Sequence, residues 1–231
     1  ALLRANAVVF QNPDNKKTFI NLGLVNPKKA VVIGGSGVNL DYFNYKPYDE
    51  KTSRFSFLMV ARLLKDKGIL EFLSAASKLK IDYPDVDFIL LGHEDKSKNA
   101  VPISEINKLN TEGVIEYHGF VDDVRDFITN CAVFVLPSYH EGMPRSVLEA
   151  MAIGRPIITT NVAGCRETVV NGTNGWLIPK GDTEALVEKM RWFLDARLEI
   201  NRMGSVSREI AEKKYDVNKI NRDVVDLVTR T

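Results

Sequence analysis

Residues 136–160 read Leu136-Pro-Ser-Tyr-His-Glu-Gly-Met-Pro-Arg-Ser-Val-Leu-Glu-Ala-Met-Ala-Ile-Gly-Arg-Pro-Ile-Ile-Thr-Thr160. The apolar run Ala132–Leu136 predicts a buried parallel strand, and Ile157–Thr160 predicts a second one. Between them Pro144 suits the first helical position. The helix and its end are indicated by Val147, Leu148, Met151 and Ala152, followed by Gly154 and Pro156. The unit is therefore strand, helix, strand with a right-handed crossover, and its loop opens at the carboxyl edge of the sheet.

Two glutamates flank the predicted helix start. Glu141 lies in the loop, where a carboxylate can accept hydrogen bonds from sugar hydroxyls, and Glu149 lies just past the first turn, where it can accept both hydroxyls of a ribose. The unpaired N–H groups of the helix start suit phosphate oxygens. Gly142 permits backbone conformations that are closed to other residues. The alternative is that Glu149 only stabilises the helix dipole and Glu141 is merely solvated.

The complete pattern carries a family resemblance. Glu-x7-Glu stands within Glu141-Gly142-x-Pro144 and Glu149-Ala150-Met151-Ala152-x-Gly154-x-Pro156. It resembles the signature of the retaining glycosyltransferases of GT-B architecture, called family 4 or group 1. Further matching stretches are Ala7-Val-Val-Phe10, Ser36-Gly-Val-Asn39, Ala61-Arg-Leu63 with Lys67-Gly68, Leu91-Gly92, and Asn171-Gly172-x-x-Gly175-Trp-Leu-Ile178. The resemblance covers nearly the whole chain and is closest to bacterial enzymes that add N-acetylhexosamines to lipid-linked glycans.

Composition indicates a soluble globular protein. Of 231 residues, 45% are hydrophobic and 26% charged, and the formal net charge is +1. The near-neutral charge argues against nucleic acid as a partner. Two cysteines are too few for a disulfide scaffold, which favours a reduced cytoplasmic setting. No apolar stretch approaches the roughly 20 residues that span a bilayer, so we expect any membrane contact, at the inner face of the cytoplasmic membrane, to be peripheral.

Strands and helices alternate along the chain, which predicts an α/β fold with a Rossmann-like, doubly wound parallel sheet. The expected strands are Ala7–Phe10, Ala30–Ile33, Phe55–Ala61, Asp87–Leu91, Val114–Tyr117, Ala132–Leu136, Ile157–Thr160 and Trp176–Ile178. We expect a linker at 43–53 and a nucleotide-sugar-binding domain, the C-terminal donor domain of a GT-B fold, at 54–214.

The segments on either side of that domain are too short to be domains. By resemblance, residues 1–42 are the remnant of an N-terminal acceptor domain, and the C-terminal segment 215–231 is a helix, at about Asn218–Val228, that crosses back to it. The chain therefore looks truncated, and the missing N-terminal domain is its expected partner. We expect Val8, Phe10, Val32 and Ile33 to lack their usual cover and to promote self-association.

Two basic residues follow the predicted strand Phe55–Ala61. Arg62 and Lys67 should therefore lie at the carboxyl edge of the sheet, where cations can neutralise a diphosphate without a metal. Lys67 with Gly68 can also be a turn with a solvated lysine. The resemblance matches both basic positions to diphosphate contacts of the family.

The resemblance also assigns the remaining site residues. Glu141 is the catalytic candidate, and the donor-binding candidates are Arg62, Lys67, Gly142, Met143, Pro144, Arg145, Ser146, Val147, Glu149, Gly37 and Val121. Arg145, Ser146 and Val147 are expected to offer backbone donors to phosphate. Gly37 lies in a turn where Ser36 and Asn39 depart from the family's Asn-Gly-Val-Asp, and its glycine can equally serve only to shape that turn.

No metal ligand is assigned. Asp85-Val86-Asp87 fits the Asp-x-Asp pattern that binds a divalent ion in the other major glycosyltransferase architecture. It precedes a predicted strand, however, and therefore lies at the amino edge of the sheet, opposite the inferred site. A solvated loop explains it better, and the resemblance implies that no metal cofactor is required.

The resemblance implies retaining transfer from a UDP-sugar, with UDP-N-acetylgalactosamine as the first donor to try. The implied acceptor is a glycan, such as one linked to undecaprenyl diphosphate, in O-antigen or lipopolysaccharide biosynthesis. The family's N-terminal half supplies acceptor contacts and a histidine near the reacting carbon, so this chain alone is expected to bind without turnover. Two alternatives stay open: a noncatalytic nucleotide-binding module and a sugar-nucleotide epimerase of GT-B shape.

Overall fold

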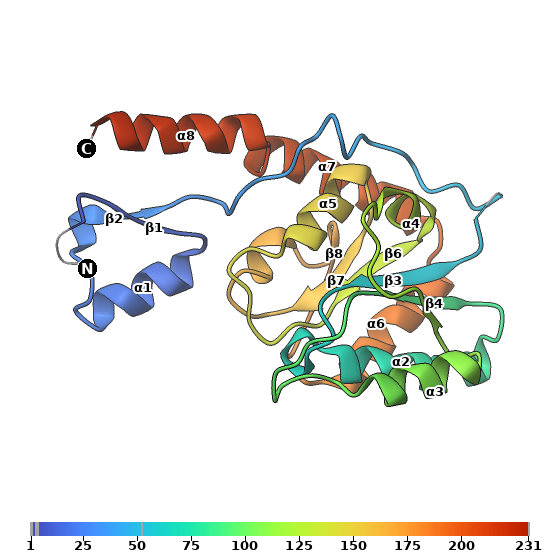
Figure 1. Ribbon diagram of the computed structural model, residues 1–231. Helices are drawn as coiled ribbons and strands as arrows, with labels where there is room; N and C mark the ends of the chain where they lie inside the picture. The colour runs from blue at the N-terminus through green and yellow to red at the C-terminus, as the bar shows by residue number, and fades with distance from the viewer. Residues whose placement is uncertain (1, 3–4, 52, 231) are drawn as a thin grey trace.

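The structure, a computed structural model, describes residue 2, residues 5–51 and residues 53–230 (Figure 1). Residues 1, 3, 4, 52 and 231, which fall in the expected remnant, linker and C-terminal helix, lie outside the described residues. The described chain forms a small lobe, residues 8–33, and a large lobe, residues 56–214, each built on a parallel sheet.

The large sheet has six strands in the order β5-β4-β3-β6-β7-β8, and all its pairs are parallel. The strands are β3 (Ser56–Val60), β4 (Asp87–Leu91), β5 (Glu116–Tyr117), β6 (Val133–Leu136), β7 (Ile157–Thr160) and β8 (Gly175–Ile178). This is the Rossmann order, which reverses direction between β3 and β6. The predicted doubly wound sheet is confirmed, and each predicted strand lies within two residues of its observed ends.

Helices cover both faces of this sheet (Figure 1). One face carries α2 (Ile69–Asp82), α3 (Ile103–Thr111) and α6 (Thr183–Asp195), and the other carries α4 (Arg125–Asn130), α5 (Arg145–Ile153) and α7 (Glu199–Lys214). The short 3-10 helices η2 (Pro27–Lys29), η3 (Lys65–Lys67) and η4 (Arg166–Thr168) shape the loops. Because both faces are covered, the central strands are apolar throughout; β6 and β7 are buried at every position.

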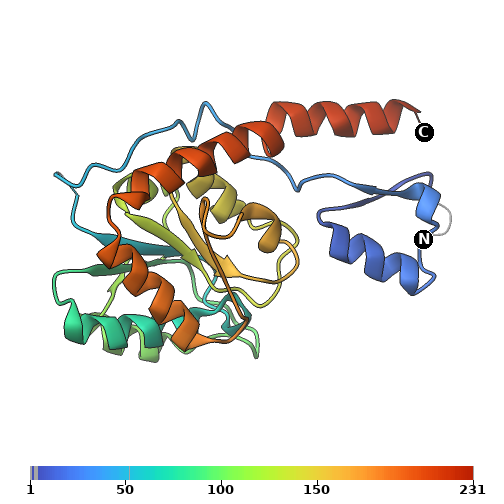
Figure 2. The same cartoon turned by 180° about the vertical axis from the view of Figure 1, so that it is seen from behind.

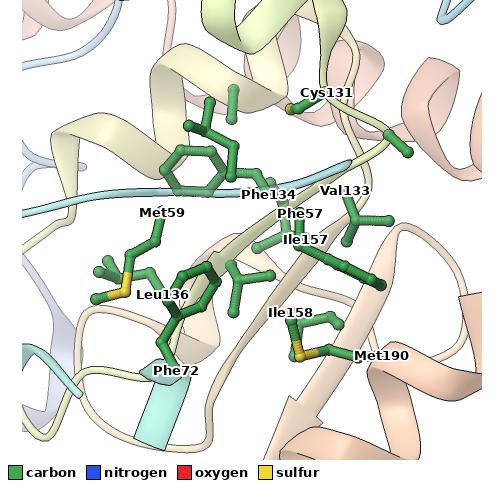
Figure 3. Close-up of a cluster of buried hydrophobic side chains, with 14 of the residues drawn as sticks. Phe57, Met59, Phe72, Cys131, Val133, Phe134, Leu136, Ile157, Ile158 and Met190 are labelled. Atoms are coloured by element: carbon green, nitrogen blue, oxygen red, sulfur yellow. The ribbon is translucent and has the colours of Figure 1, made fainter. Parts of the chain in front are cut away.

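The core of the large lobe fills the space between the sheet and these helices. Figure 3 shows Phe57, Met59, Phe134 and Met190 packed among neighbouring strands and helices. All four side chains are fully buried, and the rings of Phe57 and Phe88 stack with centroids 5.6 Å apart. Burial of this apolar surface, at about 25 cal/mol per Å², holds the sheet and therefore the loops at its edge in place.

The small lobe is one strand-helix-strand unit. β1 (Val8–Phe10) pairs in parallel with β2 (Ala30–Val32), and α1 (Pro13–Asn21) connects them. The expectation that these side chains lack cover is wrong for Phe10 and Ile33, which are only 7% and 6% exposed. Phe10 is covered by α1, whose Phe19 ring packs on it with centroids 5.3 Å apart. Val32 is 37% exposed, as expected.

The last helix returns from the large lobe to the small one. α8 (Val217–Arg230) begins beside the segment that joins the lobes. There the Val38 amide donates a hydrogen bond to the Tyr215 carbonyl, and the Val217 amide donates one to the Val38 carbonyl. It then runs past β2, and both views place the two chain ends on that side (Figures 1 and 2). A hollow of about 290 Å³ separates α8 from β2. Within the described residues, no helix combines the length and apolarity needed to cross a membrane.

Candidate functional site

Two loops meet at the carboxyl edge of the large sheet. β3 and β6 are neighbours, yet the chain leaves β3 toward α2 on one face and leaves β6 toward α5 on the other (Figure 1). Connections that diverge in this way leave a crevice in which α/β proteins bind ligands. The loop after β3 carries Arg62 and Lys67, and the loop after β6 carries residues 137–144. The structure therefore puts both predicted groups of residues at one edge.

Lys67 and Glu141 meet across this crevice. Lys67 Nζ lies 2.6 Å from Glu141 Oε1, and the two side chains are only 19% and 13% exposed. Opposite charges attract more strongly where little water screens them, and each charge offsets the cost of burying the other. The pair thus keeps a cation and an acceptor together at the sheet edge, ready for a ligand that carries both anionic and hydroxyl groups.

A glycine lets the two loops approach. Gly68, which follows Lys67, has φ of +77°, and a Cβ there would lie 2.2 Å from the carbonyl oxygen of Pro137. The carbonyl of Asp66 also accepts a 2.7 Å hydrogen bond from the backbone of the loop after β6. Gly68 is therefore required both for the left-handed backbone and for the contact between the loops.

The start of α5 faces the same edge. Pro144 is its N-cap and forms no side-chain capping bond, and in the described structure the backbone N–H groups of Arg145 and Ser146 have no hydrogen-bond partner. Glu149, one turn further, is 9% exposed, and its Oε1 accepts a 3.0 Å hydrogen bond from Arg145 Nε. Burial raises the pKa of Glu149, while Arg145 opposes that shift. The site thus offers unpaired amides to an anion and a buried acceptor to hydroxyls.

A hollow of about 600 Å³ lies beside Glu149 and Arg145. It brings these two residues together with Gly37, another of the donor-binding candidates. Its lining is Ser36, Gly37, Val38, Asn39, Tyr42, Phe43, Asp122, Asp123, Val124, Arg145, Glu149 and Val217. A cavity of this volume, with a buried carboxylate in its wall, suits a small organic ligand.

A smaller hollow of about 170 Å³ adjoins it, because Val124 lines both. It is lined by Val60, Ala61, Arg62, Leu91, Gly92, His93, Phe120, Val121 and Val124. Arg62 and Val121, both donor-binding candidates, thus line one hollow. Arg62 Nη1 lies 3.4 Å from Asp95 Oδ2, but the Arg62 side chain is 55% exposed, so this weak pair leaves the guanidinium able to turn to a ligand.

Residues of the small lobe contact the loop that carries Glu141, a contact that the residue pattern does not predict. Asn12 Nδ2 donates to the carbonyl oxygen of Gly142 at 2.8 Å and to that of Glu141 at 3.4 Å. Met143 packs against Gly35, where an added Cβ would lie 2.7 Å from the Met143 side chain. Asn12 before Pro13 could be recognised as a helix cap, but no local signal indicates a partner 130 residues away.

Three local expectations differ from the structure. Pro144 is the N-cap of α5 and not its first helical residue. Gly142 is not among the glycines with positive φ; its missing Cβ instead makes room for Gln11 Oε1, which would lie 2.0 Å from such an atom. The Val147 amide already donates to the Pro144 carbonyl at 3.1 Å, so of these three expected donors Arg145 and Ser146 keep unpaired amides in the described structure.

The proposed rival metal motif lies elsewhere. Asp87 is the first residue of β4, at the amino edge of the sheet, and its Oδ1 lies 3.3 Å from Arg54 Nη2. The chemistry of the carboxyl edge is instead that of an anion and polyol site: three cations, unpaired amides and two largely buried carboxylates. Such groups can bind a sugar joined to a diphosphate and stabilise charge on the diphosphate when that bond breaks.

A family model described as "Glycosyl transferases group 1" matches residues 43–210. Similar curated proteins include an N,N'-diacetylbacillosaminyl-diphospho-undecaprenol alpha-1,3-N-acetylgalactosaminyltransferase of Campylobacter jejuni, 32% identical over 98% of this chain and 61% of that protein. A UDP-Gal:alpha-D-GlcNAc-diphosphoundecaprenol alpha-1,3-galactosyltransferase of Escherichia coli is 28% identical over 93% of this chain and 57% of its own. The chain thus spans about three fifths of the length of these relatives.

Solved structures share the fold. An Anabaena protein, Alr3699/HepE, in complex with UDP superposes with a TM-score of 0.86 at 21% identity, over 98% of this chain and 64% of that one. Sucrose-phosphate synthase of Thermosynechococcus elongatus superposes with a TM-score of 0.85 at 22% identity, over 99% of this chain and 59% of that one.

Proposed function

This chain belongs to the group 1 glycosyltransferases, and from this premise we propose that it binds a UDP-sugar for retaining transfer of an N-acetylhexosamine to a lipid-linked or polysaccharide acceptor. One observation carries the proposal. Glu141 and Glu149 are both largely buried, each is paired with a cation, and they flank the unpaired amides at the start of α5. A nucleotide sugar offers the matching groups in the matching order: sugar hydroxyls, diphosphate and ribose hydroxyls.

Each part of the donor has a proposed contact. Glu141 accepts hydrogen bonds from the transferred sugar, and Glu149 accepts hydrogen bonds from the ribose hydroxyls. Lys67 and Arg62 neutralise the charge of the diphosphate. The base occupies the smaller hollow at Val121. The positive end of α5 adds to the stabilisation of the leaving UDP, and these fixed groups need no rearrangement as charge develops. No metal has a role in this proposal.

The relatives support the donor class and leave the sugar to be tested. A solved relative holds UDP, the Campylobacter jejuni protein is named for N-acetylgalactosamine transfer, and the Escherichia coli protein is named for galactose transfer from UDP-Gal. Both curated names also specify acceptors on diphospho-undecaprenol. We therefore place UDP-N-acetylgalactosamine first among donors and an undecaprenyl-diphosphate-linked glycan first among acceptors, which implies peripheral contact with the membrane at the cytoplasmic face.

The test is a donor panel with the full-length protein and lipid-linked acceptors. We expect transfer from a UDP-N-acetylhexosamine with retained anomeric configuration, read by NMR of the product. Calorimetric titration with UDP should show large losses of affinity in Arg62→Ala and Glu149→Ala, and wild-type affinity in Arg191→Ala, a control because Arg191 pairs with Asp82 on the distant helical face. Equal, weak binding by all variants would instead favour a noncatalytic module, and interconversion of the free donor would favour an epimerase.

A further inference from the structure

We propose that Asn12 is a positioning residue of the donor site, which acts from the small lobe by orienting the two peptide groups that follow Glu141. The inference rests on the proposed function, since it assigns Asn12 to the same donor site. Asn12 has no contact with the crevice itself: its side chain is fully buried between α1 and the loop after β6. It acts on the donor through the backbone that it holds.

Both polar atoms of the Asn12 side chain form hydrogen bonds. Its Oδ1 accepts a 2.8 Å hydrogen bond from the Asn15 amide and so caps α1. Because that contact fixes which end of the carboxamide faces the helix, Nδ2 faces the loop, where it donates to the carbonyl oxygens of Gly142 at 2.8 Å and of Glu141 at 3.4 Å. One planar group therefore links the first turn of α1 to two successive peptide groups of the donor loop.

Holding the carbonyls orients the amides. The described chain has no cis peptide bond, and in a trans peptide the C=O and the N–H point in opposite directions. With the carbonyls of Glu141 and Gly142 turned toward Asn12, the N–H groups of Gly142 and Met143 point away from the small lobe. Neither amide has a hydrogen-bond partner in the described structure. These two amides directly follow Glu141 in the chain, so the same anchorage sets the place of the Glu141 backbone and of two unpaired N–H groups beside it.

A cap alone does not require asparagine. Aspartate and serine cap a helix about as well, but a carboxylate has no N–H and would face two carbonyl oxygens, and a serine hydroxyl is too short to reach them from the same cap. The neighbouring contact strengthens the case, because Gln11 Oε1 also fits against the bare Cα of Gly142. The small lobe thus touches the loop at the peptides that carry the proposed sugar contacts.

The test uses the full-length protein with Asn12→Asp and Asn12→Ser, both of which keep a capping acceptor. We expect kcat to fall at least 10-fold in both variants while the Kd for UDP alone stays within about twofold, because UDP contacts α5, Lys67 and Glu149, whereas the sugar contacts the Glu141 loop. The matched control is Asn26→Asp: Asn26 is an exposed cap whose Oδ1 accepts from the Lys28 amide at 2.9 Å, and its variant should keep wild-type kcat.

The outcomes separate the two proposals. Wild-type protein that binds no UDP would overturn the proposed function and this inference with it. Wild-type protein that is active, with Asn12→Ser equally active, would overturn the inference alone. A parallel loss of UDP binding and kcat in Asn12→Ser would assign Asn12 a purely structural role and also overturn it. Should Asn12→Asp fail to fold because its carboxylate is buried, Asn12→Ser, which adds no charge, decides the question.

Discussion

Glu149→Gln should weaken UDP binding and at the same time leave the unliganded protein as stable as wild type or more so. The carboxylate of Glu149 is 11% exposed, and it would accept hydrogen bonds from two ribose hydroxyls. A glutamine has nearly the same shape but no charge. Hydrogen bonds to a charged group are worth about 1.5–3 kcal/mol, and we take this as the binding free energy that the substitution loses. At 1.4 kcal/mol per factor of ten, the Kd for UDP should rise roughly 10- to 150-fold.

The effect on stability has the opposite sign because burial raises the pKa of Glu149. A raised pKa means that the folded protein holds the proton more tightly than the unfolded chain does, so ionised Glu149 opposes folding. Glutamine removes that cost, and the Arg145 it releases is 77% exposed and stays solvated. We expect a gain on the order of 1 kcal/mol at pH 7, or roughly 2–4 °C in Tm.

The gain should depend on pH in a defined direction. It is largest at neutral pH and disappears as the pH falls through the folded-state pKa of Glu149 to about 4.3, the ordinary pKa of a glutamate, since a protonated glutamate resembles glutamine. Glu209→Gln is the matched control, because Glu209 pairs with Lys213 at the same i,i+4 spacing but is 60% exposed, so both readouts should stay unchanged. Calorimetric titration and thermal unfolding from pH 4 to 8 measure the two effects. An unchanged Kd for UDP, or a Kd that rises only together with a loss of stability, refutes the assignment of Glu149.

Three further predictions concern the surroundings of the site. Lys67→Met should leave the largely buried Glu141 carboxylate without its cation and lower the free energy of unfolding by about 1–3 kcal/mol, with UDP binding lost in calorimetry; unchanged binding would contradict the diphosphate role. Gly68→Ala should lower the free energy of unfolding by at least about 2 kcal/mol, measured by denaturant unfolding. The added Cβ would lie 2.2 Å from the Pro137 carbonyl oxygen, and alanine would have to adopt the φ of +77° that Gly68 has. Burial raises the pKa of Cys131 to about 12 and of Cys165 to about 11, so neither thiol should react with a thiol reagent at pH 8 until the protein unfolds. The free energy of unfolding should fall above about pH 9, because the unfolded chain then loses thiol protons that the folded protein retains. Rapid labelling of the native protein would contradict this prediction.

The fold was predictable because its signals are local. β6, α5 and β7 follow from apolar runs separated by proline and glycine, and the alternation of such units along the chain predicts the parallel sheet. The reversal of strand order between β3 and β6 then places Arg62 and Lys67 opposite Glu141, although 74 residues separate Lys67 from Glu141. Periodicity and the handedness of crossovers carry that much tertiary information.

Side-chain partners were not predictable in the same way. The sequence places Lys67 and Glu141 at one edge, but only the structure shows that they pair with each other. It also shows that Phe10 is covered by α1, that the Val147 amide is engaged within its own helix turn, and that Asn12 reaches from a helix cap to the loop after β6. Each of these contacts depends on atomic positions to within about an ångström, and residue types and their spacing do not determine positions that finely.

The most direct test of the donor site is a crystal structure of the protein with UDP. We predict the diphosphate within hydrogen-bond distance of Lys67 Nζ and of the Arg145 and Ser146 amides, the ribose hydroxyls on the carboxylate of Glu149, and the uracil in the hollow lined by Arg62 and Val121. UDP bound on any other surface, with Glu149 still held only by Arg145, would contradict the account.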